Sequence, residues 1–391
     1  MKILIDARLW GLENTGLGRY TINLVERLKN QNRKNNYIIL LRKKYFNELK
    51  FPKNWQKVLA ESRHYSIKEQ VEIPKLISKK NPDLVHFLHF NIPLLFKGNF
   101  VVTIHDILWH KQKGTSVTTL PPHIYAAKYV GYKLVFSKAI YASKKIIVPS
   151  QSVKNELLDY YANLDREKIV VTYEGIDERL LSNPDNKKIP KKYNLRTPYF
   201  IYAGNAYPHK NLPRAIEAII RLNKVSKKKI LFAIACSRDI FLERLERFIS
   251  ESEAGDFVKV LGYVSDNDLG ALYNNSLGLL YPSFSEGFGL QGLEAIASGT
   301  LVLASNIPVF KEVYENNALY FDPYDVASMA KSMQGAIDMK KEQREKMIKK
   351  GQEFIKRYSW DRTAKETLKI YKQSLLLRSK QSLQDTVDSF K

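Results

Sequence analysis

Short apolar runs alternate with longer amphipathic stretches along this chain, and this order occurs twice. A strand, a helix and a further strand in succession predict a parallel sheet that is covered by helices on both faces. In the first half we expect strands at 2–6, 37–41, 84–87, 100–104, 145–148 and 169–172, and helices at 18–29, 68–79, 123–142 and 152–160.

The same order restarts after residues 182–192, a polar stretch with two prolines that predicts a linker. Expected strands are 199–203, 230–235, 258–261, 277–281, 301–304 and 319–321, and expected helices are 212–223, 239–250, 266–275 and 290–298. The sequence therefore predicts an α/β fold of two doubly wound, Rossmann-like domains facing a cleft, with ligands at the carboxyl ends of the strands.

The expected domain limits follow from these patterns. The first domain covers residues 1–182, a linker 183–197 and the second domain 198–357. Residues 325–356 and 360–376 are charged and helical in pattern, a C-terminal helix is placed at 358–378, and we expect 379–391 to fray.

The basic charge is concentrated in the first half of the chain. The net charge is +23; residues 1–200 hold 35 Lys and Arg against 17 Asp and Glu, and residues 107–155 hold eight lysines and no acid. This distribution favours nucleic acid, anionic lipid or a phosphorylated substrate as partner, although a lysine-rich proteome would also give a basic total.

Composition removes several classes of protein. A 44% hydrophobic content excludes wholesale disorder, and the single cysteine, Cys236, excludes an intrachain disulfide and makes a cysteine-based metal site implausible. We expect no secretory signal at the N-terminus, and residues 84–96 are too short and too polar to span a bilayer.

The most informative motif runs from Ser283 to Glu294 and follows the expected strand 277–281. Its glycines leave backbone amides uncovered just before a helix that begins near residue 290, which predicts a phosphate site. Glu286 and Glu294 would lie about 12 Å apart on a full helix, so they would bracket an elongated ligand. Alternatively, Glu286 caps the helix and Glu294 is a surface residue. The binding residues predicted between these acids are Gly287, Phe288, Gly289 and Leu290.

A second motif, residues 202–212, follows the first strand of the second domain and contains Gly204, Asn205 and Lys210. A lysine at a helix start is unfavourable beside the helix dipole, so a bound anion such as a diphosphate explains Lys210 better. The alternative is an exposed lysine after a proline turn.

Two further candidate regions follow strands of the first domain. Gly16 and Gly18 form a Gly-x-Gly loop that could bring backbone close to a ligand, although a plain glycine turn competes with that interpretation. His105 and Asp106 end a buried strand toward the cleft, where His105 could donate to a phosphate or a sugar hydroxyl; a structural histidine is the alternative. His86 and His89 end another strand, but no tight ligand spacing supports a zinc site.

Residues 122–142 combine five aromatic side chains with Lys128, Lys133 and Lys138. An aromatic and basic helix can lie on an anionic membrane. A domain helix with lysines on its solvent face explains the same pattern about equally well.

Together these motifs resemble the retaining GT-B glycosyltransferases that carry a Glu-x7-Glu motif, which Glu286 and Glu294 match. Residues 204–211 resemble the phosphate-binding lysine loop of that group, 15–20 its N-terminal glycine loop and 103–106 its His-Asp strand end. Residues 358–367 resemble its closing helix, which crosses back to the first domain. The resemblance spans nearly the whole chain.

The resemblance implies a nucleotide-sugar donor in the second domain and an acceptor in the first. Glu294 would hold the ribose hydroxyls, Glu286 would contact the donor sugar, and Lys210 with the amides of 287–290 would stabilise the departing diphosphate. His105 would approach the donor from the first domain. Many members of the group carry arginine where this chain has Asn205. Neutralisation of the diphosphate charge would therefore depend on Lys210 alone, or on Arg8 or Arg19.

The expected protein is thus a retaining glycosyltransferase. It would move a hexose, of the mannose or glucose type, from a nucleoside-diphosphate sugar to a glycan or lipid-linked acceptor in cell-surface polysaccharide or glycolipid synthesis. The resemblance implies no cofactor and no metal, and no Asp-x-Asp arrangement argues for one. We expect a cytoplasmic protein, peripheral on the inner face of the plasma membrane through helix 122–142, with no nucleic-acid partner.

Three alternatives stay open from the sequence. A GT-B relative could perform other sugar-nucleotide chemistry, such as epimerisation. The basic first half could instead bind nucleic acid, although we find no recognisable binding motif. A non-catalytic membrane-surface protein would also account for helix 122–142.

Overall fold

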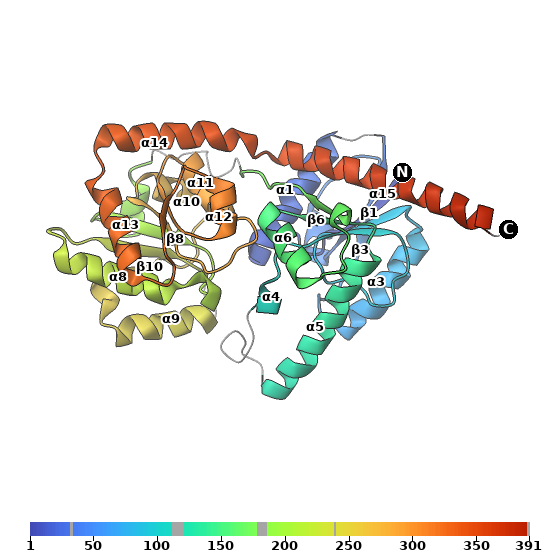
Figure 1. The fold of residues 1–391 in the computed structure, drawn as a ribbon, viewed down its shortest axis with the longest axis horizontal. Coiled ribbons are helices and arrows are strands. Elements are labelled where there is room, and N and C mark those ends of the chain that lie inside the picture. The colour runs from blue at the N-terminus through green and yellow to red at the C-terminus, as the bar shows by residue number, and fades with distance from the viewer. Residues whose placement is uncertain (32–33, 112–120, 178–185, 238–239, 389–391) are drawn as a thin grey trace. The chain divides into compact units, whose positions relative to one another are not determined.

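The computed structural model describes residues 1–31, 34–111, 121–177, 186–237 and 240–388. The chain divides into two compact units (Figure 1). The first consists of Met1–Ile107, Thr118–Gly175 and Ser359–Lys391, and the second of Leu108–Val117 and Ile176–Tyr358. Each unit is built on one parallel sheet, as the alternation of strands and helices predicts.

The first unit has a seven-stranded sheet in the order β3-β2-β1-β4-β5-β6-β7. All neighbouring strands are parallel, so each connection crosses over the sheet through a helix or loop. Its strands are β1 Lys2–Asp6, β2 Asn36–Leu41, β3 Trp55–Leu59, β4 Leu84–Phe87, β5 Phe100–Thr103, β6 Lys145–Val148 and β7 Ile169–Val171. Its helices of six residues or more are α1 Thr15–Gln31, α2 Lys43–Glu48, α3 Ile67–Lys80, α5 Pro122–Ala142, α6 Gln151–Tyr160 and α15 Trp360–Asp388.

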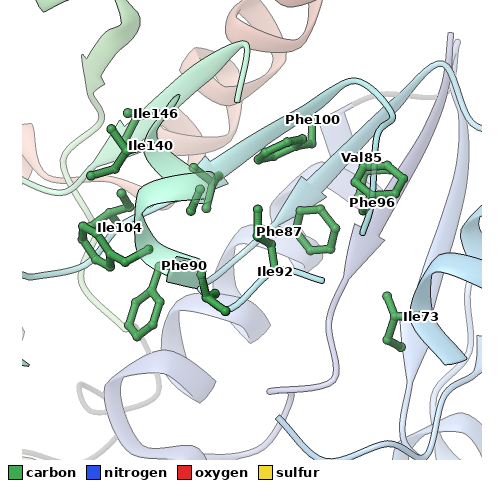
Figure 2. Close-up of a cluster of buried hydrophobic side chains, with 14 of the residues drawn as sticks. Ile73, Val85, Phe87, Phe90, Ile92, Phe96, Phe100, Ile104, Ile140 and Ile146 are labelled. Atoms are coloured by element: carbon green, nitrogen blue, oxygen red, sulfur yellow. The ribbon is translucent and has the colours of Figure 1, made fainter. Parts of the chain in front are cut away.

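Both faces of this first sheet are buried. Along β1, Leu4 belongs to one hydrophobic cluster, and its neighbours Ile3 and Ile5 belong to another. Successive strand residues point to opposite faces, so these two clusters are the cores above and below the sheet. Figure 2 shows the first of them, in which Val85 and Phe87 of β4 pack among side chains from helices and neighbouring strands. Each fully buried Ile, Leu or Phe contributes about 1.5–3 kcal/mol relative to exposure.

Helix α15 is part of the first unit although it follows the second in sequence. It packs along α1 (Figure 1), and its Tyr371 hydroxyl lies 2.7 Å from His86 Nδ1. Thr363 at its start donates to the Tyr173 carbonyl at 2.6 Å. The helix runs to Asp388, past residue 378, because residues 379–388 contain no glycine or proline to stop it.

The second unit has a six-stranded parallel sheet in the order β10-β9-β8-β11-β12-β13. Its strands are β8 Tyr199–Ala203, β9 Leu231–Ala235, β10 Val258–Val260, β11 Gly278–Tyr281, β12 Val302–Ser305 and β13 Leu319–Phe321. Its helices are α4 Leu108–Lys111, α7 Ile189–Lys192, α8 Leu212–Val225, α9 Ile240–Glu251, α10 Asp266–Asn274, α11 Leu290–Ala297, α12 Pro308–Tyr314, α13 Val326–Asp338 and α14 Lys341–Phe354.

Most expected elements lie within two or three residues of the observed ones, and the differences have local causes. The strand β3 was not predicted because its sequence WQKVL is mixed: as an outer strand it exposes Gln56 and Leu59. The short helices α2, α7 and α12 were also not predicted, and α7 falls inside the expected linker. Among the described residues, no helix is both long and apolar enough to cross a lipid bilayer.

Candidate active site

The lysine loop of the second unit follows β8 and is held by its own side chains. Gly204 has a positive φ of 144°, and the Tyr202 hydroxyl donates to the Asn205 carbonyl at 2.7 Å. The loop ends in a short 3₁₀ turn, Pro208–Lys210, and Asn211 takes the left-handed conformation before α8 begins. The Asn211 amide donates to the carbonyls of Pro282 at 3.0 Å and Pro323 at 2.8 Å. The loop is therefore fixed against the segment that follows β11.

The glycine-rich segment follows β11, the neighbour of β8 in the sheet. Gly289 precedes α11 with φ of 101°, a left-handed conformation that favours glycine. A Cβ at Gly289 would also lie 2.4 Å from the Tyr314 hydroxyl, and that hydroxyl donates to the Gly289 carbonyl. Gly289, the residue before the helix, has no side chain with which to cap α11, and in the first turn the Gly292 amide donates to the Gly289 carbonyl at 3.1 Å. The phosphate site at this helix start stays a prediction of the sequence.

Lys210 and Glu286 form a buried ion pair at the junction of the two loops. Lys210 Nζ lies 2.6 Å from Glu286 Oε1, which also accepts from the Ser283 hydroxyl at 2.7 Å. Both side chains are about one-tenth exposed. The backbone amide of Phe284 donates to the His209 carbonyl at 2.8 Å and joins the loops at the same place.

The electrostatics fix the charge of this pair. Burial alone would raise the pKa of Glu286, but the Lys210 ammonium and the hydrogen bonds from Lys210 and Ser283 lower it overall, so Glu286 is ionised at neutral pH. Burial, together with the neighbouring Lys210 charge, lowers the pKa of His209 to about 4, and His209 is therefore neutral. The loop junction carries this fixed ion pair, and the Arg214 guanidinium lies at the same place, 3.4 Å from Asn211 Oδ1 and 5.4 Å from the centre of the Phe284 ring.

The remaining residues predicted for the donor lie on the same motif. Glu294 lies within α11 and is 2% exposed, and Leu290, the first residue of that helix, is 9% exposed. Phe288 is buried against the Tyr358 ring, with ring centroids 5.6 Å apart. The structure thus brings Asn205, Lys210 and the segment from Gly287 to Glu294 to the carboxyl end of β8 and β11. It adds the direct Lys210–Glu286 contact, which the sequence did not predict.

In the first unit, His105 and Asp106 follow β5 at the carboxyl edge of its sheet. His105 Nε2 lies 3.0 Å from the Leu88 carbonyl oxygen, and its Nδ1 lies 3.6 Å from Glu174 Oε1. The Tyr20 ring packs edge-on at 4.6 Å. The imidazole is therefore held in one orientation by a backbone acceptor and a carboxylate. Glu174 was not predicted, but it follows β7 at the same sheet edge, and this position is the signal that could have identified it.

The prediction that residues 15–20 form a loop is wrong. Gly16 and Gly18 belong to the first turns of α1. A Cβ at Gly18 would lie 1.8 Å from the Gly11 carbonyl oxygen, so this glycine is required by the close approach of backbone within the first unit. Gly16 is exposed, and no atom outside its immediate neighbours lies within 4 Å of a Cβ placed there.

Arg8 binds two carboxylates of the first unit, and not the phosphate that the sequence suggested. Its guanidinium binds Asp6 through Nε at 2.8 Å and Nη2 at 2.6 Å, and Nη2 also lies 2.7 Å from Glu69 Oε1. Arg8 is 1% exposed. The suggestion that Arg8 compensates for Asn205 is therefore wrong, because its guanidinium is inaccessible and its Nε, Nη1 and Nη2 atoms already donate within the first unit.

The side chains considered as metal ligands are bound to other side chains of the protein. His86 bridges the Tyr371 hydroxyl at 2.7 Å and the Thr103 hydroxyl at 2.9 Å. The chain does contain an Asp-x-Asp sequence at 266–268, but it forms the first turn of α10, where Asp268 binds Lys192 at 2.6 Å. Over the ranges that the structure describes, no group of three His, Cys, Asp or Glu side chains could hold a metal ion.

Comparison with known proteins agrees with this arrangement. A model described as Glycosyltransferase Family 4 matches residues 14–180, and one described as Glycosyl transferases group 1 matches residues 185–354. The O-antigen chain mannosyltransferase RfbU of Salmonella typhimurium strain LT2 is 34% identical, over 73% of this chain and 72% of that protein. The O-antigen chain mannosyltransferase B of Escherichia coli is 28% identical over 70% of each chain.

Solved structures share the fold. The Anabaena protein HepE, crystallised with UDP and glucose, superposes with a TM-score of 0.72 at 16% identity and covers 95% of this chain and 100% of that one. At such identity the likeness concerns the fold alone, whereas the family models and RfbU concern the sequence itself. The chain therefore belongs to the group 1 and family 4 glycosyltransferases with the GT-B fold, and it is a hexosyltransferase.

Proposed function

We propose that the protein is a retaining transferase that moves a mannose- or glucose-type hexose from a nucleoside-diphosphate sugar to a glycan or lipid-linked acceptor. The reaction serves cell-surface polysaccharide synthesis, as the names of the O-antigen mannosyltransferases indicate for those relatives. The observation that carries the proposal is the buried Lys210–Glu286 pair, whose glutamate directly precedes the glycine-rich start of α11. It joins a cation, a helix N-terminus and a carboxylate within one unit.

The chemistry of each group follows from its surroundings. As the bond between the sugar and the diphosphate breaks, negative charge grows on the phosphate oxygens. The Lys210 ammonium and the amides of residues 287–290 stabilise that charge where it develops. Ionised Glu286 accepts hydrogen bonds from donor-sugar hydroxyls, and Glu294 accepts them from the ribose. In the first unit, His105, Asp106 and the exposed backbone at Gly16 contribute to the transfer from the acceptor side.

The stereochemical outcome tests the proposal directly. With GDP-mannose or UDP-glucose, both α-linked, proton NMR of the new glycosidic bond is expected to show the α configuration. A β-linked product would overturn retention, and an interconverted nucleotide sugar without any transfer would indicate an epimerase. A nucleotide sugar at 100 times its Kd is expected to raise the apparent free energy of unfolding by about 2.7 kcal/mol.

We infer that the reaction requires no metal or other cofactor, with the Lys210 ammonium as the cation that contacts the departing diphosphate once donor-sugar hydroxyls share Glu286. Incubation with excess EDTA is expected to leave the transfer rate unchanged. A rate that falls with EDTA and returns with Mg²⁺ or Mn²⁺ would overturn this.

We also propose that α5 places the protein on an anionic membrane, at the cytoplasmic face. Residues 121–131 include none that is buried, and the start of α5 extends beyond the rest of the first unit (Figure 1). Apolar side chains at Val130 and Leu134 are 59% and 57% exposed on a helix that carries three lysines and no acid. Such a face suits an anionic lipid surface better than water.

Vesicle binding tests this part of the proposal. Replacing Lys128 and Lys133 by glutamine is expected to weaken sedimentation with phosphatidylserine vesicles by about thirtyfold, from about 1 kcal/mol per lysine. The matched control replaces Lys349 and Lys350, two exposed lysines of α14, and is expected to bind as the parent does. Equal loss in both variants would show a general charge effect and not an α5 surface.

A further inference from the structure

Asn211 joins three loops at the carboxyl edge of the second sheet. It directly follows Lys210 in the loop after β8, and its side-chain amide donates to the Pro282 carbonyl at 3.0 Å and to the Pro323 carbonyl at 2.8 Å. Pro282 directly follows β11, and Pro323 follows β13. A single side chain therefore connects the lysine loop to segments that lie 71 and 112 positions further along the chain.

The hydrogen-bonding groups of this side chain are all engaged. An asparagine amide offers two N–H donors and one carbonyl oxygen. The Asn211 nitrogen donates to both proline carbonyls, and its Oδ1 accepts from Arg214 Nη1 at 3.4 Å. Asn211 is 2% exposed, so water competes little for these bonds. Loss of the amide would remove this donor from two buried carbonyls, and the lysine loop would lose its side-chain link to both segments.

The backbone conformation of Asn211 separates two roles of this residue. Its φ is 57° and its ψ is 30°, in the left-handed region that favours glycine and, among residues with a Cβ, asparagine. Glycine would keep this turn but has no side chain to bind the proline carbonyls. The turn alone therefore accounts for either asparagine or glycine here, and only the bonds of the amide require asparagine.

The charged groups of the candidate active site lie on the loops that Asn211 joins. Lys210 precedes it by one residue, and Glu286 lies in the segment after β11. The Lys210 ammonium lies 2.6 Å from Glu286 Oε1, and this distance depends on how the two loops are held together. The Phe284 amide also joins the loops, since it donates to the His209 carbonyl at 2.8 Å. Loss of the Asn211 amide is therefore expected to shift Lys210 without detaching its loop.

A second asparagine of α8 has the same kind of bonding at the opposite edge of the sheet. The Asn223 amide donates to the Ile219 and Ile230 carbonyls, each at 2.9 Å, and its Oδ1 accepts from the Ile230 amide at 2.9 Å. Ile230 directly precedes β9, so Asn223 lies at the amino edge of the parallel strands. Comparison of the two asparagines separates the general cost of losing such an amide from an effect on the candidate active site.

We propose that Asn211 is a positioning residue for hexosyl transfer, which acts through Lys210. By binding the segments after β11 and β13, its amide holds the Lys210 ammonium where negative charge grows on the departing diphosphate. Because both amide donors bind backbone carbonyls, Asn211 offers no donor to the substrate itself. The assignment rests on the proposed function, in which Lys210 stabilises the diphosphate charge.

Asn211→Gly tests the proposal, because it keeps the left-handed turn and removes only the side chain. The release of GDP from GDP-mannose, or of UDP from UDP-glucose, is measured with methyl α-mannoside as acceptor. A misplacement of 1 Å can cost about a hundredfold in rate, but the Phe284–His209 bond limits the shift, so kcat is expected to fall by about tenfold. The donor KM is expected to stay within about twofold, because the charge that Lys210 stabilises develops in the transition state.

Two further variants control for folding, which circular dichroism measures at the assay temperature. Asn223→Ala also removes an amide that binds two carbonyls, and it is expected to keep kcat within about twofold of the parent. Asn211→Ser offers one hydroxyl, which can donate to at most one of the two proline carbonyls. Its kcat is expected to lie between those of Asn211→Gly and the parent, and it serves as the test where the glycine variant does not fold.

The coupling between Asn211 and Lys210 is a readout that a purely structural role would not produce. In Lys210→Met the ammonium that Asn211 positions is gone. Asn211→Gly is therefore expected to lower the rate by about tenfold in the parent and by less than about twofold in Lys210→Met. A general weakening of the second unit would lower the rate by the same factor in both.

The outcomes distinguish this role from the proposed function. Parent-like kcat in folded Asn211→Gly overturns the positioning role, even where Lys210→Met is strongly impaired. An equal loss in the two backgrounds, or an equal loss in Asn223→Ala, also overturns it. Nucleotide release at the parent rate in Lys210→Met instead overturns the proposed role of Lys210, and with it the route through which Asn211 acts.

Discussion

Replacing Lys210 by methionine is expected to lower hexosyl transfer by about 10²- to 10³-fold, the usual loss when one fixed group that stabilises developing charge is removed. The physical reason is that Lys210 is a cation held in place by Glu286 at the junction of the lysine loop and the glycine-rich loop. The measurement is the rate of transfer at saturating donor, together with the donor KM. The matched control is Lys192→Met, which breaks an equally short but more exposed pair with Asp268 in the same unit and is expected to leave transfer unchanged.

Loss of folding must be separated from loss of catalysis in this experiment. Lys210→Met leaves Glu286 buried without its counter-charge, which destabilises the second unit. The double variant Lys210→Met with Glu286→Gln removes that buried charge, so it is expected to recover thermal stability and remain inactive. A double variant that is stable and transfers at the parent rate would remove Lys210 from the mechanism.

The same pair predicts a pH dependence of stability. The folded-state pKa of Glu286 is depressed below its usual value of 4.5, so the pair stabilises the fold above that value. The contribution is lost as the pH falls through the depressed folded-state pKa.

The largest expected effect on stability is that of Arg8→Met. Its guanidinium lies between the carboxylates of Asp6 and Glu69, and all three side chains are at most 3% exposed. Removing it leaves two buried negative charges side by side, a change that costs about 3–5 kcal/mol of unfolding free energy in comparable buried pairs. The measurement is urea unfolding of the first unit, and the control is Arg63→Met at an exposed position, expected within about 0.5 kcal/mol of the parent.

The pH response distinguishes this mechanism from simple loss of packing. In the parent protein, burial would raise the pKa of Asp6, but the charge and hydrogen bonds of Arg8 outweigh burial, so this pKa is lowered overall. The pKa of Glu69 is raised, chiefly by burial. Without Arg8, the carboxyl pKa values of the folded state rise above those of the unfolded chain. The variant is therefore expected to gain stability as the pH falls from 7 to about 5, whereas a pure packing defect would show no such gain.

Much of the fold and of the donor loops could be predicted from the sequence, because the signals are local. Apolar runs of strand length mark β1, β4, β6, β8 and β13 at their observed limits. Gly289 is needed for a left-handed turn directly before a helix, and Lys210 follows a proline turn. Strand ends of a parallel sheet share one edge, so these loops could be placed together before any coordinates were known.

The sequence alone thus determined the alternating architecture, the two sheets and the loops that follow β8, β11 and β5. Only the tertiary structure decided which charged groups meet: Lys210 with Glu286 across 76 positions, Arg8 with Glu69 across 61, and His105 with Glu174. The reason is physical. The hydrophobic pattern of a strand or helix can be read from consecutive residues. The partner of a buried charge, by contrast, depends on which strand ends the fold brings together and on which group offsets the cost of desolvating that charge.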